Sequence, residues 1–197
     1  MKESLSLVFV CIANRNRSPF AEFFFSKLIS EKDKGFVNEI RVTSAGFIPQ
    51  RMKEKMVELH ISQPEPFFGR PLARTTRTAL LSQGITVSDG WRTKALIPEM
   101  IEEADLLLTA LSEQKRTLMR LYPKAAARIF TMREISQWDG YLLQEDYDFK
   151  GIPRDGTLWD YVEENAEYVS NILSETENML VKAYPHILNQ LGLKATE

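Results

Sequence analysis

The sequence predicts an α/β protein built around a parallel β-sheet. Three observations support this class: short, strand-like runs recur along the chain, amphipathic stretches of helical length separate them, and Gly, Pro and polar residues mark the changeovers. The 197 residues are 44% hydrophobic and 26% charged, which is ordinary for a globular protein and speaks against disorder. Since no linker or repeat divides the chain, we expect one domain over residues 1–197.

Four segments are predicted as strands. The first, residues 5–11, is a continuous apolar and β-branched run that suits a buried central strand. The other three candidates are similarly short and lie at residues 39–44, 105–110 and 127–132.

Helices are predicted between and after these strands. The first begins near Ser18, which stands where an N-cap belongs, and Pro19 suits its first turn. Further helices are expected at residues 71–83, 98–104, 112–123 and 158–183, the last followed by Pro185 and a short final helix. This alternation predicts a three-layer α/β/α arrangement with a central four-stranded parallel sheet and Rossmann-like or flavodoxin-like topology.

Composition excludes several classes of function. A formal net charge of −2 is too small for a general nucleic-acid binder, and no apolar stretch reaches the length of a membrane span. With one cysteine and two histidines, we expect no intramolecular disulfide and no metal site. The apolar run near the N-terminus ends in Asn and Arg rather than in a cleavage site, so we expect a cytoplasmic protein that partners neither nucleic acid nor membrane.

The segment from Cys11 to Ser18 carries the chemistry. It follows the first strand and precedes the first helix, where α/β folds bind their ligands. A loop curling over a helix N-terminus offers backbone N–H groups and the positive end of the helix dipole to an anion, and the same field favours the thiolate of Cys11. A thiolate beneath a bound phosphate is an in-line nucleophile.

Three more side chains fit this chemistry. Arg17, six residues after Cys11, can bind two phosphate oxygens with its planar guanidinium. Ser18 can donate a hydrogen bond to the sulfur, and Asn14 can brace the loop with its side-chain amide.

Cys11-Ile12-Ala13-Asn14-Arg15-Asn16-Arg17-Ser18-Pro19 resembles the active-site loop of the low-molecular-weight protein tyrosine phosphatases, within the arsenate-reductase-like superfamily. The similarity continues in Ala21-Glu22 and in residues 43–47, 83–96 and 102–110. It implies a phosphatase with a cysteinyl-phosphate intermediate, no cofactor, and inorganic phosphate or sulfate as an active-site ligand. It further implies that residues 12–17 hold the phosphate and that Asn14 and Ser44 support the loop.

The chain departs from the family pattern at three loop positions. Ala13 replaces a glycine, which would be strained if that position needs a positive φ. Asn16 replaces the second loop cysteine. Arg15 stands where apolar residues are common, and we hypothesise that it lies at the rim of the site and favours a substrate with additional negative charge. Residues 47–77 also form a longer loop region than the family has, and in it Phe67 and Phe68 either wall the site or cover the core edge.

The general acid is the least defined part. The family uses an Asp, usually followed by Pro, on a loop before the last helix, but residues 144–165 contain no Asp-Pro pair. A small gap in the alignment brings Asp155 within one residue of the acid position. We therefore predict Asp155 as the acid, with Asp148 and then Asp146 as alternatives.

The leading functional prediction is hydrolysis of phosphomonoesters, with phosphotyrosine in proteins as the expected substrate class and small phosphomonoesters as alternatives. Arsenate reduction with an external thiol is a second possibility, since no further cysteine could pass oxidation along the chain. A third is a phosphate- or phosphoprotein-binding module that has weak or lost catalysis.

Overall fold

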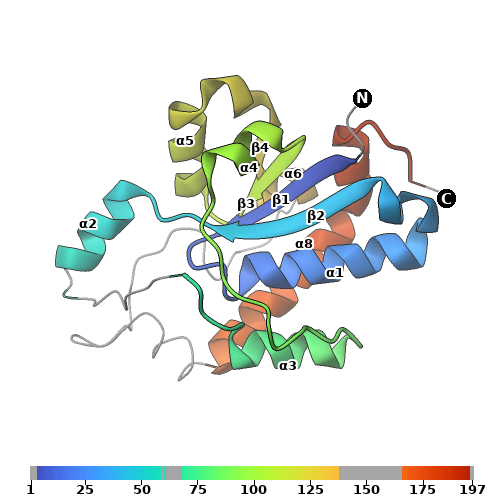
Figure 1. Ribbon diagram of the computed structural model, residues 1–197, viewed down its shortest axis with the longest axis horizontal. Coiled ribbons are helices and arrows are strands. Elements are labelled where there is room, and N and C mark those ends of the chain that lie inside the picture. The colour runs from blue at the N-terminus through green and yellow to red at the C-terminus, as the bar shows by residue number, and fades with distance from the viewer. Residues whose placement is uncertain (1–3, 59, 61–67, 138–165, 196–197) are drawn as a thin grey trace.

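Four parallel strands form the centre of the protein. In the computed structural model, which describes residues 4–58, 60, 68–137 and 166–195, they are β1 (Leu5–Cys11), β2 (Ile40–Gly46), β3 (Leu106–Thr109) and β4 (Ile129–Thr131). They are hydrogen-bonded in the order β2-β1-β3-β4 (Figure 1). The four strands and their parallel direction confirm the predicted sheet.

The strand register places the segment that begins at Cys11 at a switch point in the topology. Cys11 at the end of β1 pairs with Gly46 at the end of β2, and Val10 pairs with Thr109 at the end of β3. The chain passes from β1 to one neighbour and later returns to the other side of β1. In open parallel sheets a crevice forms at such a point, beside the carboxyl ends of the strands.

Helices cover both faces of the sheet, which confirms the predicted three layers (Figure 1). On one face Leu7 and Phe9 of β1 pack in a cluster with residues of α1 (Arg17–Lys32), α3 (Arg74–Ser82) and α8 (Ala166–Gln190). On the other face Val8 and Val10 pack against α4 (Pro98–Glu103) and α5 (Ser112–Leu121). Shorter elements complete the fold: η1 (Lys34–Asn38), α2 (Gln50–Glu58), η2 (Pro123–Arg128) and α6 (Met132–Ser136).

The start of α1 differs from the prediction. The helix begins at Arg17, so Ser18 lies inside its first turn, and the prediction that Ser18 caps the helix was wrong. Asn16 occupies the cap position, but its side chain caps no backbone N–H. The reason is that the Ser18 hydroxyl is engaged by other side chains of the loop, as described below.

The end of the chain also differs from the prediction. A break at Pro185 was expected, but α8 continues through it to Gln190. Residues on both sides of the proline, including Tyr184 and Ile187, are buried in the same core cluster. Burying such side chains is worth roughly 1.5–3 kcal/mol each, which together outweighs the ~3 kcal/mol cost of a proline in a helix. Residues 158–165 of the predicted helix lie outside the described residues.

Helix α6 was not predicted, although the sequence carries its signal. Thr131 and Glu134 form a capping box: Thr131 Oγ1 accepts a hydrogen bond from the Glu134 N–H (3.0 Å), and Glu134 Oε2 accepts one from the Thr131 N–H (2.8 Å). Thr followed three residues later by Glu is the sequence pattern of this motif. Across the described part of the chain, no helix is both long and apolar enough to cross a membrane.

Candidate active site

The loop between β1 and α1 surrounds the single cysteine of the chain. Cys11 is the last residue of β1 and is 4% exposed. The next five residues, Ile12 to Asn16, are called the cradle loop here, and α1 begins directly after them. The first N–H groups of this 16-residue helix have no partners within the helix. Their position close to a buried thiol is favourable for binding an anion.

Ser18 contacts the sulfur directly. Its hydroxyl donates a hydrogen bond to Cys11 Sγ over 3.0 Å and accepts one from Asn14 Nδ2 over 3.1 Å. The same oxygen lies 3.3 Å from the Ala45 carbonyl oxygen, a second acceptor for its one proton. Because Ser18 is fully buried, water does not compete for this proton, and the hydroxyl is well placed to stabilise negative charge on sulfur.

Asn14 connects the cradle loop to two neighbouring segments. Its Nδ2 group donates to Ser44 Oγ of β2 (2.7 Å), and its Oδ1 accepts from the backbone N–H of Lys94 (2.9 Å). Asn14 has a φ of 52°, a left-handed conformation that Asn tolerates better than most residues. The positive φ therefore falls on Asn14 and not on Ala13, so the alanine that replaces a family glycine introduces no backbone strain.

Glu22 extends this chain of hydrogen bonds, and sequence reasoning assigned it no role. Ser44 Oγ donates to Glu22 Oε2 over 2.5 Å, one turn further along α1 than Ser18. Burial raises the pKa of the Glu22 carboxyl, and the Ser44 hydrogen bond and the Lys94 charge only partly oppose this effect. The signal in the sequence was the i+4 spacing of Ser18 and Glu22, which places both side chains on one face of a helix.

We expect Glu22→Gln to raise the free energy of unfolding at pH 7. A carboxyl whose pKa is raised by folding destabilises the native state above that pKa, and the penalty disappears as the pH falls through it. The advantage of the amide should therefore shrink between pH 7 and pH 4, as measured by urea unfolding. Glu31→Gln, on the exposed part of α1, is the control. A larger gain from Glu22→Gln at pH 4 than at pH 7 would contradict the prediction.

The start of α3 holds the other end of the cradle loop. Thr76 Oγ1 donates to Asn16 Oδ1 over 2.8 Å, and the Ala73 N–H donates to the Arg15 carbonyl over 3.4 Å. Thr76 is fully buried. Asn16, which stands where the family has its second cysteine, thus fixes the loop to α3 by a polar contact. Residues 71–73 of the predicted helix precede α3, which begins at Arg74.

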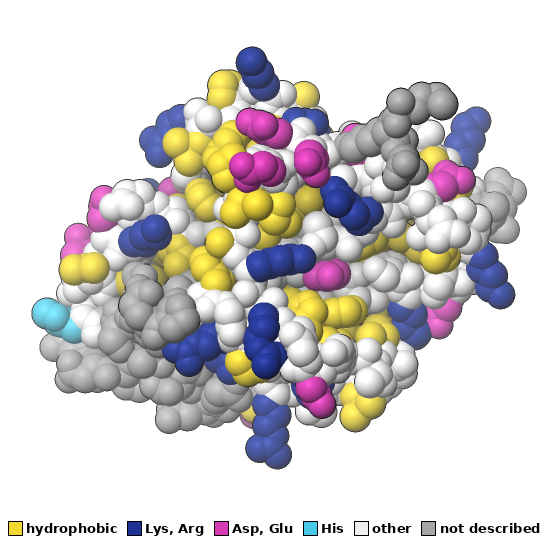
Figure 2. Space-filling view, viewed as in Figure 1, with side chains coloured by type: hydrophobic (Ala, Val, Ile, Leu, Met, Phe, Trp, Pro, Cys, Tyr) yellow, Lys and Arg dark blue, Asp and Glu magenta, His cyan; other side chains and the backbone are white. Residues whose placement is uncertain are grey.

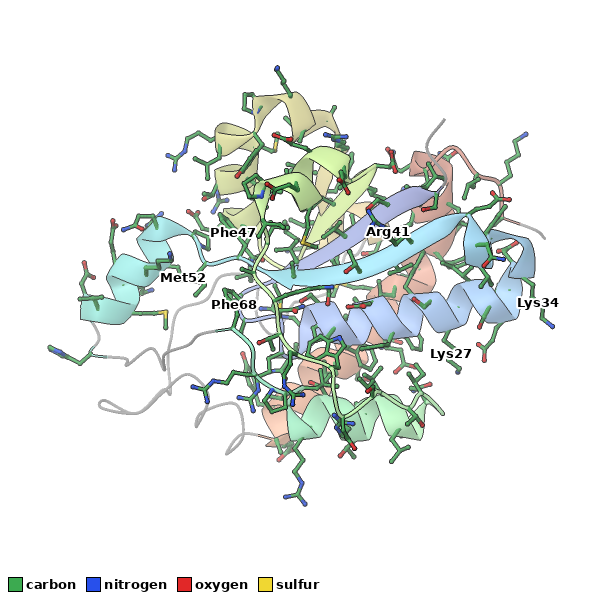
Figure 3. All side chains as sticks on the ribbon, viewed as in Figure 1. Lys27, Lys34, Arg41, Phe47, Met52 and Phe68 are labelled. Atoms are coloured by element: carbon green, nitrogen blue, oxygen red, sulfur yellow. The ribbon has the colours of Figure 1, made fainter. Side chains whose placement is uncertain are left out.

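Phe68 packs beneath the cradle loop. It contacts an apolar cluster that includes Ile12, Ala13 and Met52. In Figure 3, Phe68 and Phe47 lie near the carboxyl end of β2, and Met52 lies on α2. Gly46 at the end of β2 allows this close approach, because a Cβ there would lie 2.4 Å from Phe68 Cε1 and 2.8 Å from the Ile12 carbonyl oxygen. Phe67, the neighbour expected to act with Phe68, lies outside the described residues.

We expect Gly46→Ala to lower kcat/KM for a phosphomonoester about 100-fold. The added methyl group must displace the Ile12 backbone, and a shift of about 1 Å in a catalytic loop can cost ~10²-fold in rate. The melting temperature should also fall, since overpacking costs about 1–3 kcal/mol. Gly35→Ala is the matched control, because a Cβ at Gly35 meets nothing within 4 Å. Equal activity of the two variants would show that the cradle loop tolerates the displacement.

Of the remaining predicted site residues, the structure describes the two arginines but not the candidate acids. Arg17 is the first residue of α1 and is 8% exposed, so its guanidinium lies inside the protein near the cradle loop. Arg15 is half-buried. The candidate acids Asp155, Asp148 and Asp146 all lie outside the described residues.

Comparisons with known proteins give one family match. The family described as low molecular weight phosphotyrosine protein phosphatase matches residues 6–63, which include the cradle loop and β2. No curated protein sequence matches the chain.

Several solved structures share the fold. The YwlE arginine phosphatase from Geobacillus stearothermophilus is 20% identical, with a TM-score of 0.63 over 98% of this chain and 99% of that one. A low molecular weight protein tyrosine phosphatase from T. tengcongensis is 27% identical, with a TM-score of 0.55 over 91% and 99%. A protein tyrosine phosphatase from Entamoeba histolytica is 20% identical, with a TM-score of 0.59 over 96% and 99%.

The matched family and the solved structure from T. tengcongensis are of one class: cysteine-based phosphatases of the protein-tyrosine-phosphatase type. Within that class, the predicted resemblance to the low molecular weight protein tyrosine phosphatases is confirmed.

Proposed function

We propose that this protein hydrolyses phosphomonoesters, above all phosphotyrosine in proteins, through a phosphate bound covalently to Cys11. One observation carries the proposal: the Ser18 hydroxyl donates to Cys11 Sγ at the base of a loop that leads into a helix N-terminus. A hydroxyl in this position stabilises a thiolate before attack and a departing thiolate afterwards. A solved YwlE arginine phosphatase mutant with a phosphorylated active-site serine supports a covalent phosphoenzyme in this fold.

The reaction has two steps. The Cys11 thiolate attacks phosphorus, the bond from phosphorus to the ester oxygen breaks, and a general acid protonates the leaving oxygen. Water then attacks phosphorus, the bond to sulfur breaks, and the thiolate returns while the carboxylate takes a proton from the water. We assign the acid to Asp155, with Asp148 as the alternative. The cysteine supplies the nucleophile, so this mechanism needs no metal ion.

The phosphate oxygens require positive partners in both steps. The backbone N–H groups of the cradle loop and the Arg17 guanidinium supply them, and negative charge on these oxygens grows in the transition state. Asn14 and Ser44 keep the loop in shape through the hydrogen bonds described above. The rigid support matters because donors stabilise a transition state best when they need not reorganise.

The charge of Arg15 influences which class of substrate the site accepts. A second guanidinium beside the phosphate repels a cationic leaving group, such as a guanidinium, and attracts acidic groups that flank a phosphotyrosine. Figure 2 shows further Lys and Arg side chains across the middle of this face, over β2 and towards α3, while acidic side chains gather over α4. This favours phosphotyrosine over phosphoarginine, although solved neighbours of both kinds share the fold.

We expect Arg15→Ala to lower kcat/KM for an acidic phosphotyrosine peptide roughly fivefold more than for a neutral one, because a half-exposed charge pair is worth about 1 kcal/mol. Steady-state kinetics on two peptides that differ only in flanking residues measure the ratio. Arg120→Ala, an exposed position at the end of α5, should leave the ratio unchanged. If Arg15→Ala leaves it unchanged as well, Arg15 does not select the substrate.

The test of the proposal uses the one thiol of the chain. Wild-type protein should hydrolyse para-nitrophenyl phosphate in the presence of EDTA, and alkylation by iodoacetamide should abolish turnover while modifying Cys11 alone. Inorganic phosphate should protect both the thiol and the activity. Phosphate protection without turnover would instead favour a binding module, and arsenate-dependent consumption of an added thiol would favour an arsenate reductase.

A further inference from the structure

Asn16 occupies the N-cap position of α1 without capping the helix. An N-cap Asn ordinarily accepts a hydrogen bond from the N–H of the second or third helical residue. The side chain of Asn16 caps no backbone N–H, and its Oδ1 atom accepts from Thr76 Oγ1 of α3 over 2.8 Å instead. The oxygen atom that could cap α1 is therefore bound by a residue of another helix.

The sequence at the start of α1 leaves a single N–H for an ordinary cap. The helix begins at Arg17, so Ser18 and Pro19 are its second and third residues. Proline has no backbone N–H, which leaves the Ser18 N–H as the donor for an N-cap side chain. Ser18 also contacts the nucleophile, because its hydroxyl donates to Cys11 Sγ over 3.0 Å. The N–H that a cap would take thus belongs to the residue beside the thiol.

A capping oxygen and a phosphate oxygen would compete for this N–H. The backbone of each residue carries one N–H donor, and Asn is among the residues most favoured at an N-cap. The cysteine that the family has at this position offers only a weak acceptor. Asn16 therefore gives this chain an internal competitor for phosphate that the family pattern lacks.

Thr76 is well placed to hold the side chain of Asn16. It lies within α3 and is fully buried, and Leu80, one turn further along α3, is fully buried in the main core cluster. A second hydrogen bond joins the same segments, since the Ala73 N–H donates to the Arg15 carbonyl over 3.4 Å. The start of α3 is thus a fixed point for the end of the cradle loop.

The backbone of Asn16 agrees with this arrangement. Its φ and ψ are −123° and −88°, whereas an N-cap residue usually has an extended backbone. Exchanging the contact with Thr76 for an ordinary cap on Ser18 therefore requires a rotation of the Asn16 backbone. The hydrogen bonds from α3 oppose that rotation.

We propose that Thr76 is a positioning residue that holds the side chain of Asn16 away from the N-terminus of α1 and so keeps the Ser18 N–H available to phosphate. The inference rests on the proposed function, in which phosphate binds beside Cys11. Thr76 acts through Asn16 and does not touch the substrate. When its hydroxyl is lost, the Ser18 N–H is capped in a fraction of the molecules, and the apparent affinity for phosphate falls accordingly.

The experiment compares Thr76→Val, which keeps the size of the side chain but cannot donate, with Thr76→Ser, which keeps the hydroxyl. Calorimetry measures binding of inorganic phosphate, and steady-state kinetics use para-nitrophenyl phosphate. We expect Thr76→Val to bind phosphate about fivefold more weakly and KM to rise by a similar factor, as an N-cap hydrogen bond of ordinary strength implies. The kcat value should change little, because saturating substrate displaces the capping side chain. Thr76→Ser should retain most of the affinity.

Thr117→Val is the matched control, since Thr117 is a buried threonine of α5, and it should bind phosphate as wild type does. Melting temperatures check folding, and Thr76→Ala repeats the measurements with a smaller side chain. Unchanged phosphate affinity in folded Thr76→Val and Thr76→Ala would overturn the inference. Equal losses of affinity in Thr76→Ser and Thr76→Val would also overturn it, because the hydroxyl would then not be the group that matters.

A second substitution separates internal competition from a general loosening of the loop. Asn16→Ala removes the competing oxygen, so adding it to Thr76→Val should recover roughly threefold or more in phosphate affinity. Loosening predicts no recovery, because a loop that has lost one contact gains nothing when a further side chain is removed. Phosphate binding that stays weak, or weakens further, when Asn16→Ala is added would therefore contradict the role of Thr76.

Failure of the proposed function gives a different result. If wild type binds phosphate without turning over substrate, hydrolysis fails as the function, while weaker binding by Thr76→Val and its recovery with Asn16→Ala still support the positioning role. Absence of phosphate binding and of turnover in wild type would refute both proposals.

Discussion

Cys11→Ser should lose phosphomonoester turnover by on the order of 10³-fold or more while it still binds inorganic phosphate. The hydroxyl that replaces the thiol is un-ionised at neutral pH and is a far weaker nucleophile than a thiolate. The groups proposed to hold the phosphate, namely the cradle-loop N–H groups and Arg17, are unchanged by the substitution. Initial rates with para-nitrophenyl phosphate and calorimetric titration with phosphate measure the two properties separately.

The chain has one cysteine, so no second thiol can replace Cys11 as the nucleophile in this variant. Ser is close to Cys in size, and the hydroxyl can still accept from Ser18, so we expect a melting temperature close to that of wild type. Turnover within tenfold of wild type in a folded Cys11→Ser protein would exclude the covalent mechanism. Loss of phosphate binding in a folded variant would instead mean that the sulfur itself holds the anion.

Asp155→Asn should lower kcat by about 10²–10⁴-fold for a substrate with a poor leaving group, such as an alkyl phosphate. An alkoxide leaves slowly unless it is protonated, whereas para-nitrophenolate leaves without help, so the loss with para-nitrophenyl phosphate should be much smaller. Rates of both substrates, measured for wild type and variant across pH 4–8, give this difference. The alkaline limb of the kcat profile, which reports the general acid in the enzyme–substrate complex, should change with it.

Asp148→Asn is the decisive companion, since Asp148 is the alternative candidate and lies seven residues earlier in the chain. Asp89→Asn serves as the neutral control, because Asp89 is fully exposed and pairs with Arg77 over 3.1 Å. A leaving-group-dependent loss in Asp148→Asn, with none in Asp155→Asn, would reassign the acid. No such loss in either variant would point to Asp146 or to a phosphate-binding protein with weak catalysis.

The core of the fold could be predicted from local pattern alone. Residues 5–11 form a strand and residues 112–121 a helix, as their apolar spacing indicates. The errors arose where tertiary contacts outweighed local preference. Pro185 fails to end α8 because apolar residues on both sides of it are buried, and Ser18 does not cap α1 because its hydroxyl is hydrogen-bonded to Cys11 and Asn14.

The loop that follows Cys11 was visible in the sequence because its parts lie within eight residues. Cys11, Asn14 and Ser18 need only a strand–loop–helix turn to meet, and the local spacing encodes that turn. The same spacing argument could have identified Glu22, since it lies one turn after Ser18 on α1.

The sequence by itself thus determined the class of fold and the cysteine-centred loop, because strand and helix periodicity and short-range spacing are local properties of the chain. Only the tertiary structure decided what supports that loop. Lys94 reaches Asn14, Thr76 reaches Asn16 and Phe68 reaches Gly46 from segments 22–80 residues away. Such contacts depend on how helices and loops pack around the sheet, and no pattern within a short window of sequence records that packing.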